Sequence, residues 1–496
     1  MRTILRAILA ASLLTVGLAP AALADEPKAA EAKIDLPAFP ADASVKQVTH
    51  VAGKTLNYTA TVGSLPVRDE KGKKIAEVVF TAYVLDGPRD PKRPVTFAFN
   101  GGPGAASVYL NLGAIGPKRV QFGAQGDAPS DPALLVDNPG TWLDFTDMVF
   151  IDPVGTGFSR SLVDMEETKK RFFGIDADIN YLSRIVYDWL LKNGRMASPK
   201  YVSGESYGGY RGPRITYTLQ TKLGVGVNGM ILVSPYLEPP LDLSPDLSPM
   251  AWVSTLPSMA ASNYERQGKA LSPALMAEVE AYARGEYVTD LLKGRRDPAA
   301  VARLVDKVTA YTGLDRNFVQ LSGGRIDSRA YLRELYRKEG KIGSWYDSNV
   351  TQDDPFPWSA YGRRGDPILD AIIAPTTSAI VDFTTRVVGW KVEGRYNALS
   401  EEVGRNWEKG VELTSASEDL RQAVAADPKM KVLIVHGYDD LSCPYFISRL
   451  VIDQMAMSGD PNRVRLALYP GGHMFYSRPD SQTAFRQDVK GLFGAP

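Results

Sequence analysis

A series of short apolar runs, each followed at once by a turn, constrains how this chain can fold. Apolar and polar residues do not alternate within the runs, which is typical of strands buried on both faces of a parallel sheet. Helical patterns lie between several runs, so the sequence predicts an α/β fold with a mostly parallel central sheet and helices on both faces. The runs span residues 95–104, 148–159, 201–206, 229–236, 431–440 and 465–473, and the clearest helical pattern spans 175–193.

The series of runs is interrupted between about residues 240 and 425. This region holds helical patterns, and the first of them opens with Ser272-Pro273, which is typical of a capped helix start. We therefore expect a large, mainly helical cap insertion at 241–425, between core segments 46–240 and 426–496. The helical patterns span 272–292, 297–313 and 327–340. Before the first run, the β-rich segments 55–63 and 76–85 predict an antiparallel hairpin.

The first residues have the three-part pattern of a signal peptide: Arg2 and Arg6, an apolar run, and small residues ending at Ala24. We expect a signal peptide at 1–24, cleavage after Ala24, and a flexible lead-in at 25–45. No other stretch approaches the roughly 20 apolar residues of a membrane span. No span is therefore expected after cleavage.

The numbers of cysteines and charged residues limit the cellular location and the kinds of partner that the protein can have. The single cysteine, Cys443, excludes an intrachain disulfide, and an exported chain of 496 residues without disulfides suits a bacterial periplasm, so the expected location is periplasmic or secreted. The 57 basic and 57 acidic residues give no net charge with which to attract nucleic acid or an anionic membrane. We expect no metal and no cofactor.

A Gly-x-Ser-x-Gly motif marks a candidate nucleophile, Ser206, between Gly204 and Gly208. It follows a β-type run and precedes a plausible helix, which is the setting of a nucleophile elbow. A serine hydroxyl needs a base, and the chain has three histidines. His50 lies before the sheet and His436 lies inside an apolar run, where a structural role is expected. His473 follows the last run, in the order Ser–acid–His, and is the expected base.

The orienting acid should follow a strand between Ser206 and His473. The loop "HGYDDLSCP" offers Asp439 and Asp440, and its spacing favours Asp440, with Asp439 as the alternative. An oxyanion hole needs two backbone N–H donors. We expect the residue after the nucleophile, Tyr207, to supply one and the glycine-rich loop "NGGPG" at 100–104 to supply the other; an ordinary β-turn that binds no ligand is the alternative for this loop.

Several separated blocks together resemble the serine carboxypeptidase family, acid-acting exopeptidases with an α/β-hydrolase fold. They are "FNGGPGAAS" (99–107), "VFIDPVGTGFSRS" (149–161), "SGESYGGYRGPRI" (203–215), "GYDDLSCP" (437–444) and "GGHMFYSRPD" (471–480). The resemblance covers the sheet, and neither the cap nor the first ninety or so residues. It implies a triad, two oxyanion amides and two side chains that bind the substrate's C-terminal carboxylate: Ser206, Asp440 and His473; Gly102 and Tyr207; Asn100 and Glu205.

Some positions depart from the family pattern. Many members carry a glutamate that joins the carboxylate-binding network where this chain has Ala114, which puts the strength of carboxylate recognition in question. Gly104-Ala105-Ala106-Ser107 replaces the usual Gly-Cys-Ser-Ser, consistent with the absence of a disulfide. Cys443 coincides with a position where some members have a free thiol near the pocket, and a small buried hydrophobe is the alternative reading.

The resemblance implies an exported serine carboxypeptidase that hydrolyses C-terminal peptide bonds of peptide substrates through an acyl-enzyme. A serine esterase or acyltransferase on the same fold is the first alternative, because the same triad serves any acyl transfer. Asn100 and Glu205 favour the peptidase. A non-catalytic scaffold protein is the second alternative, and the joint presence of all the site residues argues against it.

Overall fold

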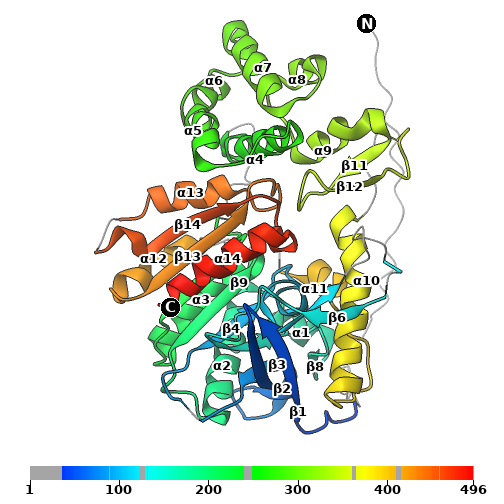
Figure 1. Ribbon diagram of the computed structural model, residues 1–496. Coiled ribbons are helices and arrows are strands. Elements are labelled where there is room, and N and C mark those ends of the chain that lie inside the picture. The colour runs from blue at the N-terminus through cyan, green and yellow to red at the C-terminus, as the bar shows by residue number, and fades with distance from the viewer. Residues whose placement is uncertain are drawn as a thin grey trace, which may run out of the picture.

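The core of the protein is a ten-stranded sheet with the strand order β1-β2-β3-β7-β4-β9-β10-β13-β14, in which β8 also pairs with β3 (Figure 1). The six strands from β7 to β14 run parallel, and the strands before them pair antiparallel. The computed structural model describes residues 36–88, 90–121, 129–130, 132–238, 248–359, 365–408, 415–456 and 459–494. The strands are β1 Ala43–Val51, β2 Lys54–Arg68, β3 Lys74–Leu85, β4 Val95–Phe99, β7 Asp147–Ile151, β8 Arg160–Ser161, β9 Lys200–Glu205, β10 Gly229–Val233, β13 Lys431–Gly437 and β14 Val464–Tyr469.

Both faces of the parallel strands are buried, which explains why their apolar runs do not alternate. In β7, Val149 and Ile151 point into one hydrophobic cluster, while Met148 and Phe150 point into the cluster on the other face. Each predicted run contains one of these strands. The expected α/β-hydrolase fold, with a mostly parallel sheet between helices, is confirmed.

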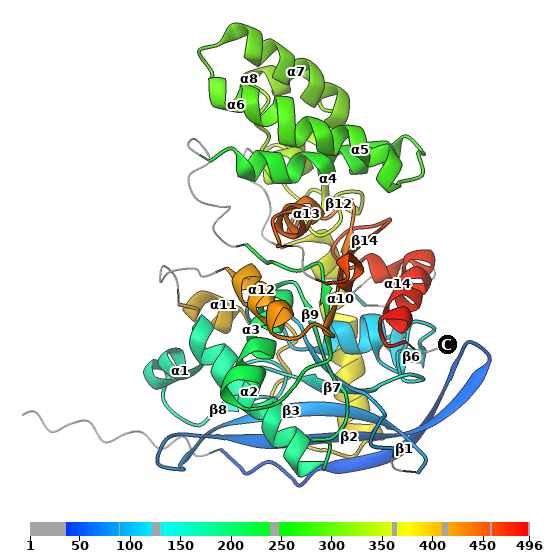
Figure 2. The ribbon, with the colours of Figure 1, turned by 90° about the vertical axis from the view of Figure 1, so that its left-hand side faces the viewer.

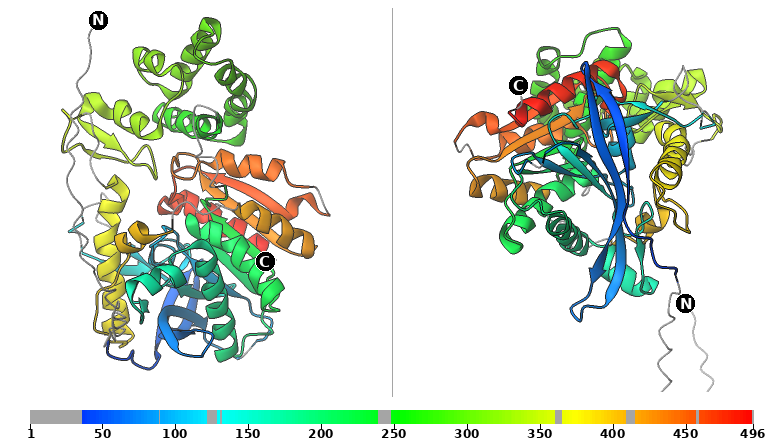
Figure 3. Two further views of the ribbon diagram at one scale, coloured as in Figure 1. Left: turned by 180° about the vertical axis from the view of Figure 1, so that it is seen from behind. Right: turned by 60° about the horizontal axis from the view of Figure 1, so that its bottom comes forward.

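Helices cover both faces of the sheet, as the right-hand view of Figure 3 shows. One face packs against α2, α3 and α12, and the other packs against α10 and α14. The helices beside the sheet are α1 Met165–Phe172, α2 Ile175–Lys192, α3 Tyr207–Lys222, α10 Pro367–Asp382, α11 Glu401–Asn406, α12 Ala416–Ala426, α13 Tyr445–Asp453 and α14 Pro479–Leu492. A small antiparallel pair, β5 Lys118–Gln121 and β6 Leu134–Asp137, and the π-helix η1 Leu110–Ile115 follow the loop after β4.

The predicted hairpin is present as β2 and β3, and a further strand, β1, pairs with β2 outside it. β1 begins at Ala43, and before it Phe39 packs on Trp390 with ring centroids 5.3 Å apart. Residues 36–45 therefore belong to the fold, which corrects the flexible lead-in expected up to residue 45. Burial alternates along β1, as is typical of a half-exposed edge strand, but Val48 is exposed while Gln47 and Thr49 point inward, so the sequence carries no matching apolar–polar alternation. The signal peptide predicted at 1–24 lies outside the described residues.

A helical cap lies beyond the carboxyl ends of the parallel strands (Figure 2). Its own hydrophobic cluster extends onto the loop after β13 and onto α13, through Tyr438, Leu441, Tyr445 and Phe446. Ser272 and Asp297 cap two of its helices as the sequence predicts, each accepting a hydrogen bond from a first-turn N–H. The cap comprises α4 Met250–Arg266, α5 Pro273–Tyr282, α6 Val288–Lys293, α7 Pro298–Thr312, α8 Arg316–Ser322, α9 Ser328–Tyr336, β11 Lys341–Gly343 and β12 Thr351–Asp353.

The later part of the expected insertion packs on the core and not on the cap. α10 contributes Ala379 and Ile380 to one core cluster, and α12 lies in the other. Between them, Ser400 N donates to Gly104 O (2.8 Å), so this segment supports the loop after β4. We propose on these contacts that the cap ends near residue 360 and that residues from 365 onward belong to the core.

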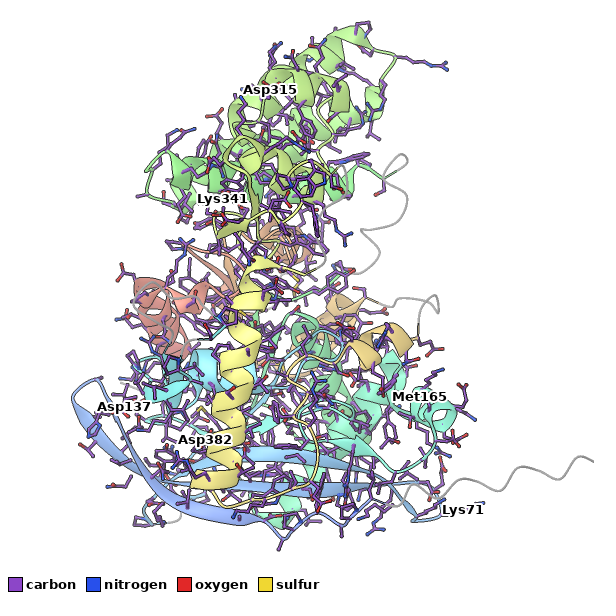
Figure 4. The ribbon with its side chains drawn as sticks, turned by 90° about the vertical axis from the view of Figure 1, so that its right-hand side faces the viewer. Lys71, Asp137, Met165, Asp315, Lys341 and Asp382 are labelled. Atoms are coloured by element: carbon purple, nitrogen blue, oxygen red, sulfur yellow. The ribbon has the colours of Figure 1, made fainter. Side chains whose placement is uncertain are left out.

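α10 continues into the π-helix η5 Phe383–Val387 and forms an apolar helix of 21 residues. Figure 4 shows it running from the cap side toward the antiparallel part of the sheet, with Asp382 labelled near that end. By length and composition this helix could cross a membrane, although Asp370, Asp382, Arg386 and several hydroxyl residues interrupt its apolar residues.

A buried ion pair joins α2 and α3 to the loop after β4. Arg211 on α3 donates from Nε to Asp178 Oδ2 on α2 (2.6 Å) and from Nη1 to the carbonyl oxygen of Asn100 (2.6 Å). Both side chains of the pair are 1% exposed. Breaking such a pair leaves one charge buried and unpaired, which costs more than the pair contributes when intact.

Arg211→Met should therefore lower the free energy of unfolding by about 3–5 kcal/mol, because Asp178 remains buried without its cation. Urea unfolding measures the change. Arg184→Ala is the matched control, since it removes an exposed pair with Asp188 and should cost less than about 0.5 kcal/mol. The double variant Asp178→Leu/Arg211→Met should recover part of the loss, and a double variant as unstable as the single one would contradict this account.

Candidate active site

Ser206 occupies a strained turn between β9 and α3. Its backbone has φ 60° and ψ −123°, a positive φ that is uncommon outside glycine. A Cβ on Gly204 would collide with the carbonyl oxygen of Gly208, and a Cβ on Gly208 would collide with that of Phe99. The Gly-x-Ser-x-Gly pattern is therefore a packing requirement of this turn, which holds Ser206 at the end of its strand.

The loop after β4 lies against the same turn. A Cβ on Gly101 would overlap the backbone nitrogen of Tyr207, so the two segments touch through their backbones. Gly102, Ser206 and Tyr207 line one pocket of about 550 Å³. Tyr207 is the first residue of α3, where an N–H has no acceptor within the helix. Its N–H can donate to an anion at that helix end.

The block at 149–161 supports the loop after β4. Ser107 N donates to Asp152 Oδ1 (2.8 Å), and Ser107 Oγ donates to the carbonyl oxygen of Ile151. Burial raises the pKa of Asp152 to about 7. Gly157 is required because a Cβ there would collide with the Asp152 carboxyl group. This block has a structural function and keeps Gly101 and Gly102 against the turn.

Asp440 and His473 form a buried hydrogen-bonded pair, Asp440 Oδ2 to His473 Nδ1, at 2.7 Å. The other carboxylate oxygen of Asp440 accepts from the backbone N–H of Ser442 (2.8 Å) and of Cys443 (2.9 Å). Burial disfavours the imidazolium, but the charge of Asp440 and its hydrogen bond outweigh burial and raise the pKa of His473. With Nδ1 engaged, Nε2 is the ring nitrogen that can accept a proton.

Cys443 connects this pair to Ser206. It lines the same pocket as Ser206, and its backbone N–H donates to Asp440. Burial raises the pKa of the Cys443 thiol, which keeps it neutral and unsuited to nucleophilic attack. Ligand atoms of Asp440, Cys443 and His473 lie within 4.8 Å of one another, as those of a metal site would. The Asp440–His473 hydrogen bond already accounts for this spacing, and we propose no metal.

The other two histidines are elsewhere. His50 Nδ1 lies 2.6 Å from Asp137 on the exposed edge of the sheet. His436 is fully buried in β13 with Nε2 2.8 Å from Ser448 Oγ, and burial lowers its pKa to about 4. A neutral, hydrogen-bonded His436 agrees with the structural role expected from its apolar run.

Asp439, the alternative acid, points away from His473. Its carboxyl group faces those of Asp347 and Glu265, and the nearest cation, Arg478, has Nη2 at 3.7 Å from Asp439 Oδ2. Burial and then the charges of Asp347 and Glu265 raise the pKa of Asp439 well above its usual range. The structure therefore brings Asp440, and not Asp439, to the imidazole.

A cap segment, residues 344–349, is hydrogen bonded to the loop that carries Asp440 and to the loop that carries His473. Trp345 and Leu441 form two hydrogen bonds. The backbone N–H of Leu441 donates to the carbonyl oxygen of Trp345, and the indole N–H of Trp345 donates to the carbonyl oxygen of Leu441. The carbonyl oxygen of Tyr346 accepts from His473 N, and Asp347 Oδ2 accepts from Gly472 N (3.0 Å). Sequence analysis missed this segment, because a Ser/Asp/Asn-rich stretch predicts only turns.

Ser234 supports the histidine from the sheet side. It follows β10 with φ 42° and donates from Oγ to the carbonyl oxygen of His473 (2.8 Å). No sequence signal distinguished this serine from others at strand ends.

Glu205 and Asn100, from the strand and the loop next to the Ser206 turn, are hydrogen bonded to each other. Asn100 Nδ2 donates to Glu205 Oε2 (2.9 Å), and the hydroxyl of Tyr476 donates to Glu205 Oε1 and Oε2 (3.0 and 2.9 Å). Burial raises the pKa of Glu205, although the charge of His473 and these two donors act in the opposite direction. The Glu205 side chain is buried, and neither it nor Asn100 lines the pocket of Ser206.

Comparison with known proteins finds serine carboxypeptidases among the similar proteins. A family model described as serine carboxypeptidase matches residues 55–264. A pheromone-processing carboxypeptidase of Yarrowia lipolytica is 23% identical over 386 residues, which cover 74% of this chain and 53% of that protein. Serine carboxypeptidase 1 of Hordeum vulgare is 31% identical over 159 residues, covering 31% of this chain and 30% of that protein.

The chain is similar to serine carboxypeptidases over residues 55–264. It spans about half the length of the Yarrowia relative and less of the other curated relatives considered. Among solved structures, the prohormone-processing carboxypeptidase Kex1 of Saccharomyces cerevisiae has the same fold, with a TM-score of 0.57 and 16% identity over 88% of this chain and 91% of that one.

The position of Asp439 generates a prediction about stability. Since folding raises its pKa, the folded protein loses stability as pH rises from about 4, the usual carboxyl pKa, toward the raised value. Asp439→Asn removes this loss, so its melting temperature relative to the wild type should increase between pH 5 and pH 8. Melting curves by circular dichroism measure it.

Asp382→Asn is the control. The ion pair with Arg386 lowers the pKa of Asp382 on an exposed helix face, so its carboxyl group is ionised in both the folded and the unfolded protein above about pH 5, and this variant should show no pH-dependent change relative to the wild type between pH 5 and pH 8. An Asp439→Asn protein that loses stability equally at every pH would mean that the carboxylate is charged and stabilising.

Proposed function

We propose that this protein is an exported serine carboxypeptidase that hydrolyses C-terminal peptide bonds. The observation that carries the proposal is the buried Asp440–His473 pair beside a serine held at a strained turn. Similarity to serine carboxypeptidases adds support. The activity of the whole protein is a proposal because the chain spans only part of the curated relatives it matches.

In the proposed acylation, Ser206 Oγ attacks the carbonyl carbon of the last peptide bond while His473 Nε2 accepts the hydroxyl proton. Asp440 holds the Nδ1–H tautomer and stabilises the imidazolium. The backbone N–H groups of Gly102 and Tyr207 donate to the oxyanion of the tetrahedral intermediate. His473 then gives its proton to the leaving nitrogen, the C–N bond breaks, and the C-terminal residue departs as a free amino acid.

In the proposed deacylation, water takes the place of the leaving amino acid. His473 accepts a proton from the water, whose oxygen attacks the acyl carbon, and the same two N–H groups stabilise the second oxyanion. The ester bond to Ser206 breaks, and the proton passes from His473 to Ser206 Oγ. This restores the free enzyme and releases the shortened peptide.

Recognition of a free carboxylate separates a carboxypeptidase from an esterase. Asn100 and Glu205 are the proposed carboxylate-binding side chains, and burial favours the protonated form of Glu205. A protonated carboxyl group can donate a hydrogen bond to a carboxylate, whereas an ionised one repels it. An esterase or acyltransferase does not need to bind a free carboxylate, so the buried acid Glu205 favours a carboxypeptidase over these two classes of enzyme.

Export is the part of the proposal that rests on the N-terminal sequence. The charged start, the apolar run and the small residues before Asp25 support a signal peptide cleaved after Ala24 and a periplasmic or secreted protein. Comparing the N-terminal residue and mass of the expressed protein in a periplasmic fraction tests this part separately.

Ser206→Ala should abolish labelling by a fluorophosphonate and lower turnover by roughly 10⁴ or more, because no other group supplies the nucleophile. Asp440→Asn should lower turnover by about 10⁴, since an amide favours the wrong imidazole tautomer. Ser203→Ala is the control: Ser203 is a buried serine of the same strand, with no hydrogen-bond partner for its hydroxyl among the described residues. Labelling of another serine in Ser206→Ala would refute the assignment.

The pH dependence of KM tests the carboxypeptidase. As pH rises through the raised pKa of Glu205, its ionisation should increase KM for a peptide with a free carboxylate and leave KM for the matched peptide amide unchanged. The ionisable groups around Glu205 are His473, Asp440 and Tyr476, so the site titrates as a coupled unit. Glu205→Gln, which can donate at every pH, should flatten the difference. Equal KM profiles for acid and amide would favour an esterase.

A further inference from the structure

The histidine loop, residues 470–478, ends at Arg478, whose guanidinium group reaches two acidic residues of the cap. Arg478 donates from Nη1 to Glu265 Oε1 on α4, and from Nη2 to Asp347 Oδ2 (2.9 Å) in the segment 344–349. Nη2 also lies 3.3 Å from Glu265 Oε2. One planar cation thus joins two separate segments of the cap to the loop that carries the proposed base.

The two glycines before His473 fit around these contacts. Gly472 N donates to the same Asp347 oxygen, Oδ2, that accepts from Arg478 (3.0 and 2.9 Å). A Cβ on Gly472 would collide with Asp347. A Cβ on Gly471 would lie 2.9 Å from Arg478 Nε, so the guanidinium group would have to move. The loop therefore folds around one carboxylate of the cap, and His473 lies between the two points of contact.

The cap is attached to the loop of the proposed acid and to the histidine loop by different forces. Its hydrophobic cluster includes Tyr438 and Leu441, which lie close to Asp440 in the sequence. In the histidine loop, Phe475 and Tyr476 pack instead into a cluster of the core. Apolar contact therefore fixes the cap to the loop of the proposed acid, whereas hydrogen bonds and charge fix it to the loop of the proposed base.

Three carboxyl groups face the guanidinium group of Arg478. Besides those of Glu265 and Asp347, Asp439 Oδ2 lies 3.7 Å from Arg478 Nη2. Burial alone would raise the pKa of Glu265, but the hydrogen bonds from Arg478 and other neighbours lower it. Without Arg478, an ionised Glu265 would face two further carboxyl groups with no cation between them. Repulsion of this kind would separate the cap from the histidine loop.

We propose that Arg478 is a positioning residue for the proposed base, His473. By binding Asp347 and Glu265 of the cap, it holds the histidine loop so that the imidazole faces Ser206. The inference rests on the proposed function, and within it on the nucleophile and the base. Arg478 acts through the loop and not on the substrate, so its loss should slow the chemical step more than it weakens binding.

The experiment measures kcat and KM for a peptide acid, per active site counted by complete fluorophosphonate labelling. Arg478→Gln should lower kcat by roughly 10²-fold and change KM by less than about twofold, because a displaced base slows the reaction and leaves substrate binding in place. Arg478→Lys keeps the charge without the planar two-nitrogen fork, and should recover part of the loss. The initial rate of labelling of Ser206 is a second readout that does not depend on the choice of substrate.

Arg284→Gln is the matched control. Arg284 lies in the cap and donates from Nη1 to Asp453 Oδ2 on α13 (2.8 Å), so this variant removes another ion pair between cap and core. It should leave kcat unchanged. A loss of kcat as large as that in Arg478→Gln would mean that any loosening of the cap has the same effect, and would overturn the assignment of Arg478.

A double-variant cycle tests the path through the cap. Glu265→Gln alone should lower kcat, and Arg478→Gln/Glu265→Gln should be no slower than Arg478→Gln, because both changes break the same link. Losses that add in the double variant would show that the two residues act independently, and would overturn the link.

The remaining outcomes separate positioning from stability. A folded Arg478→Gln enzyme with the kcat of the wild type would overturn the proposal, whether or not its melting temperature falls. If Arg478→Gln does not fold, Arg478→Lys decides: a lowered kcat at an unchanged melting temperature supports the proposal, and an unchanged kcat overturns it. A wild type in which Ser206 is not labelled would refute the proposed function itself.

Discussion

The close approach of two backbones is the constraint on which the rest of the site depends. The loop after β4 and the turn after β9 touch at Gly101, Gly204 and Gly208, where no Cβ can be accommodated. The contact requires β4 and β9 to be adjacent parallel strands, so that their carboxyl ends meet at one edge. It also forces Ser206 into a positive φ, and buried support offsets that strain: the Arg211–Asp178 pair on one side and the Asp152 block on the other.

Carboxyl groups that are neighbours in the sequence, such as those of Asp439 and Asp440, lie in different surroundings in the folded protein. Asp440 accepts two backbone N–H bonds and faces an imidazole. Asp439, one residue earlier, is buried among other carboxyl groups and its pKa is raised. Glu205 is also buried, but donors surround it. The candidate site thus places one carboxyl group against the imidazole and another, Glu205, in a buried position where its pKa is raised.

The cap does more than cover the sheet, because its segment 344–349 is hydrogen bonded to both loops that carry Asp440 and His473. A change in the position of the cap would therefore move the proposed base relative to Ser206. The cap also lines the pocket of Ser206 through Trp252 and Arg329. In the proposed carboxypeptidase, the cap would therefore link substrate selection to alignment of the proposed triad.

The sequence by itself determined the parallel strands, the helices between them, the strand–turn–helix around Ser206 and the choice of His473 over His50 and His436. These follow from local patterns: apolar runs, caps, and glycines that a tight turn requires. The tertiary structure decided the partner of His473, because Asp439 and Asp440 have the same composition and differ only in where their side chains point. It also decided that Tyr476 lies beside Glu205 and that residues 344–349 support the histidine. These residues lie far apart along the chain, and only the packing of the folded core brings them together.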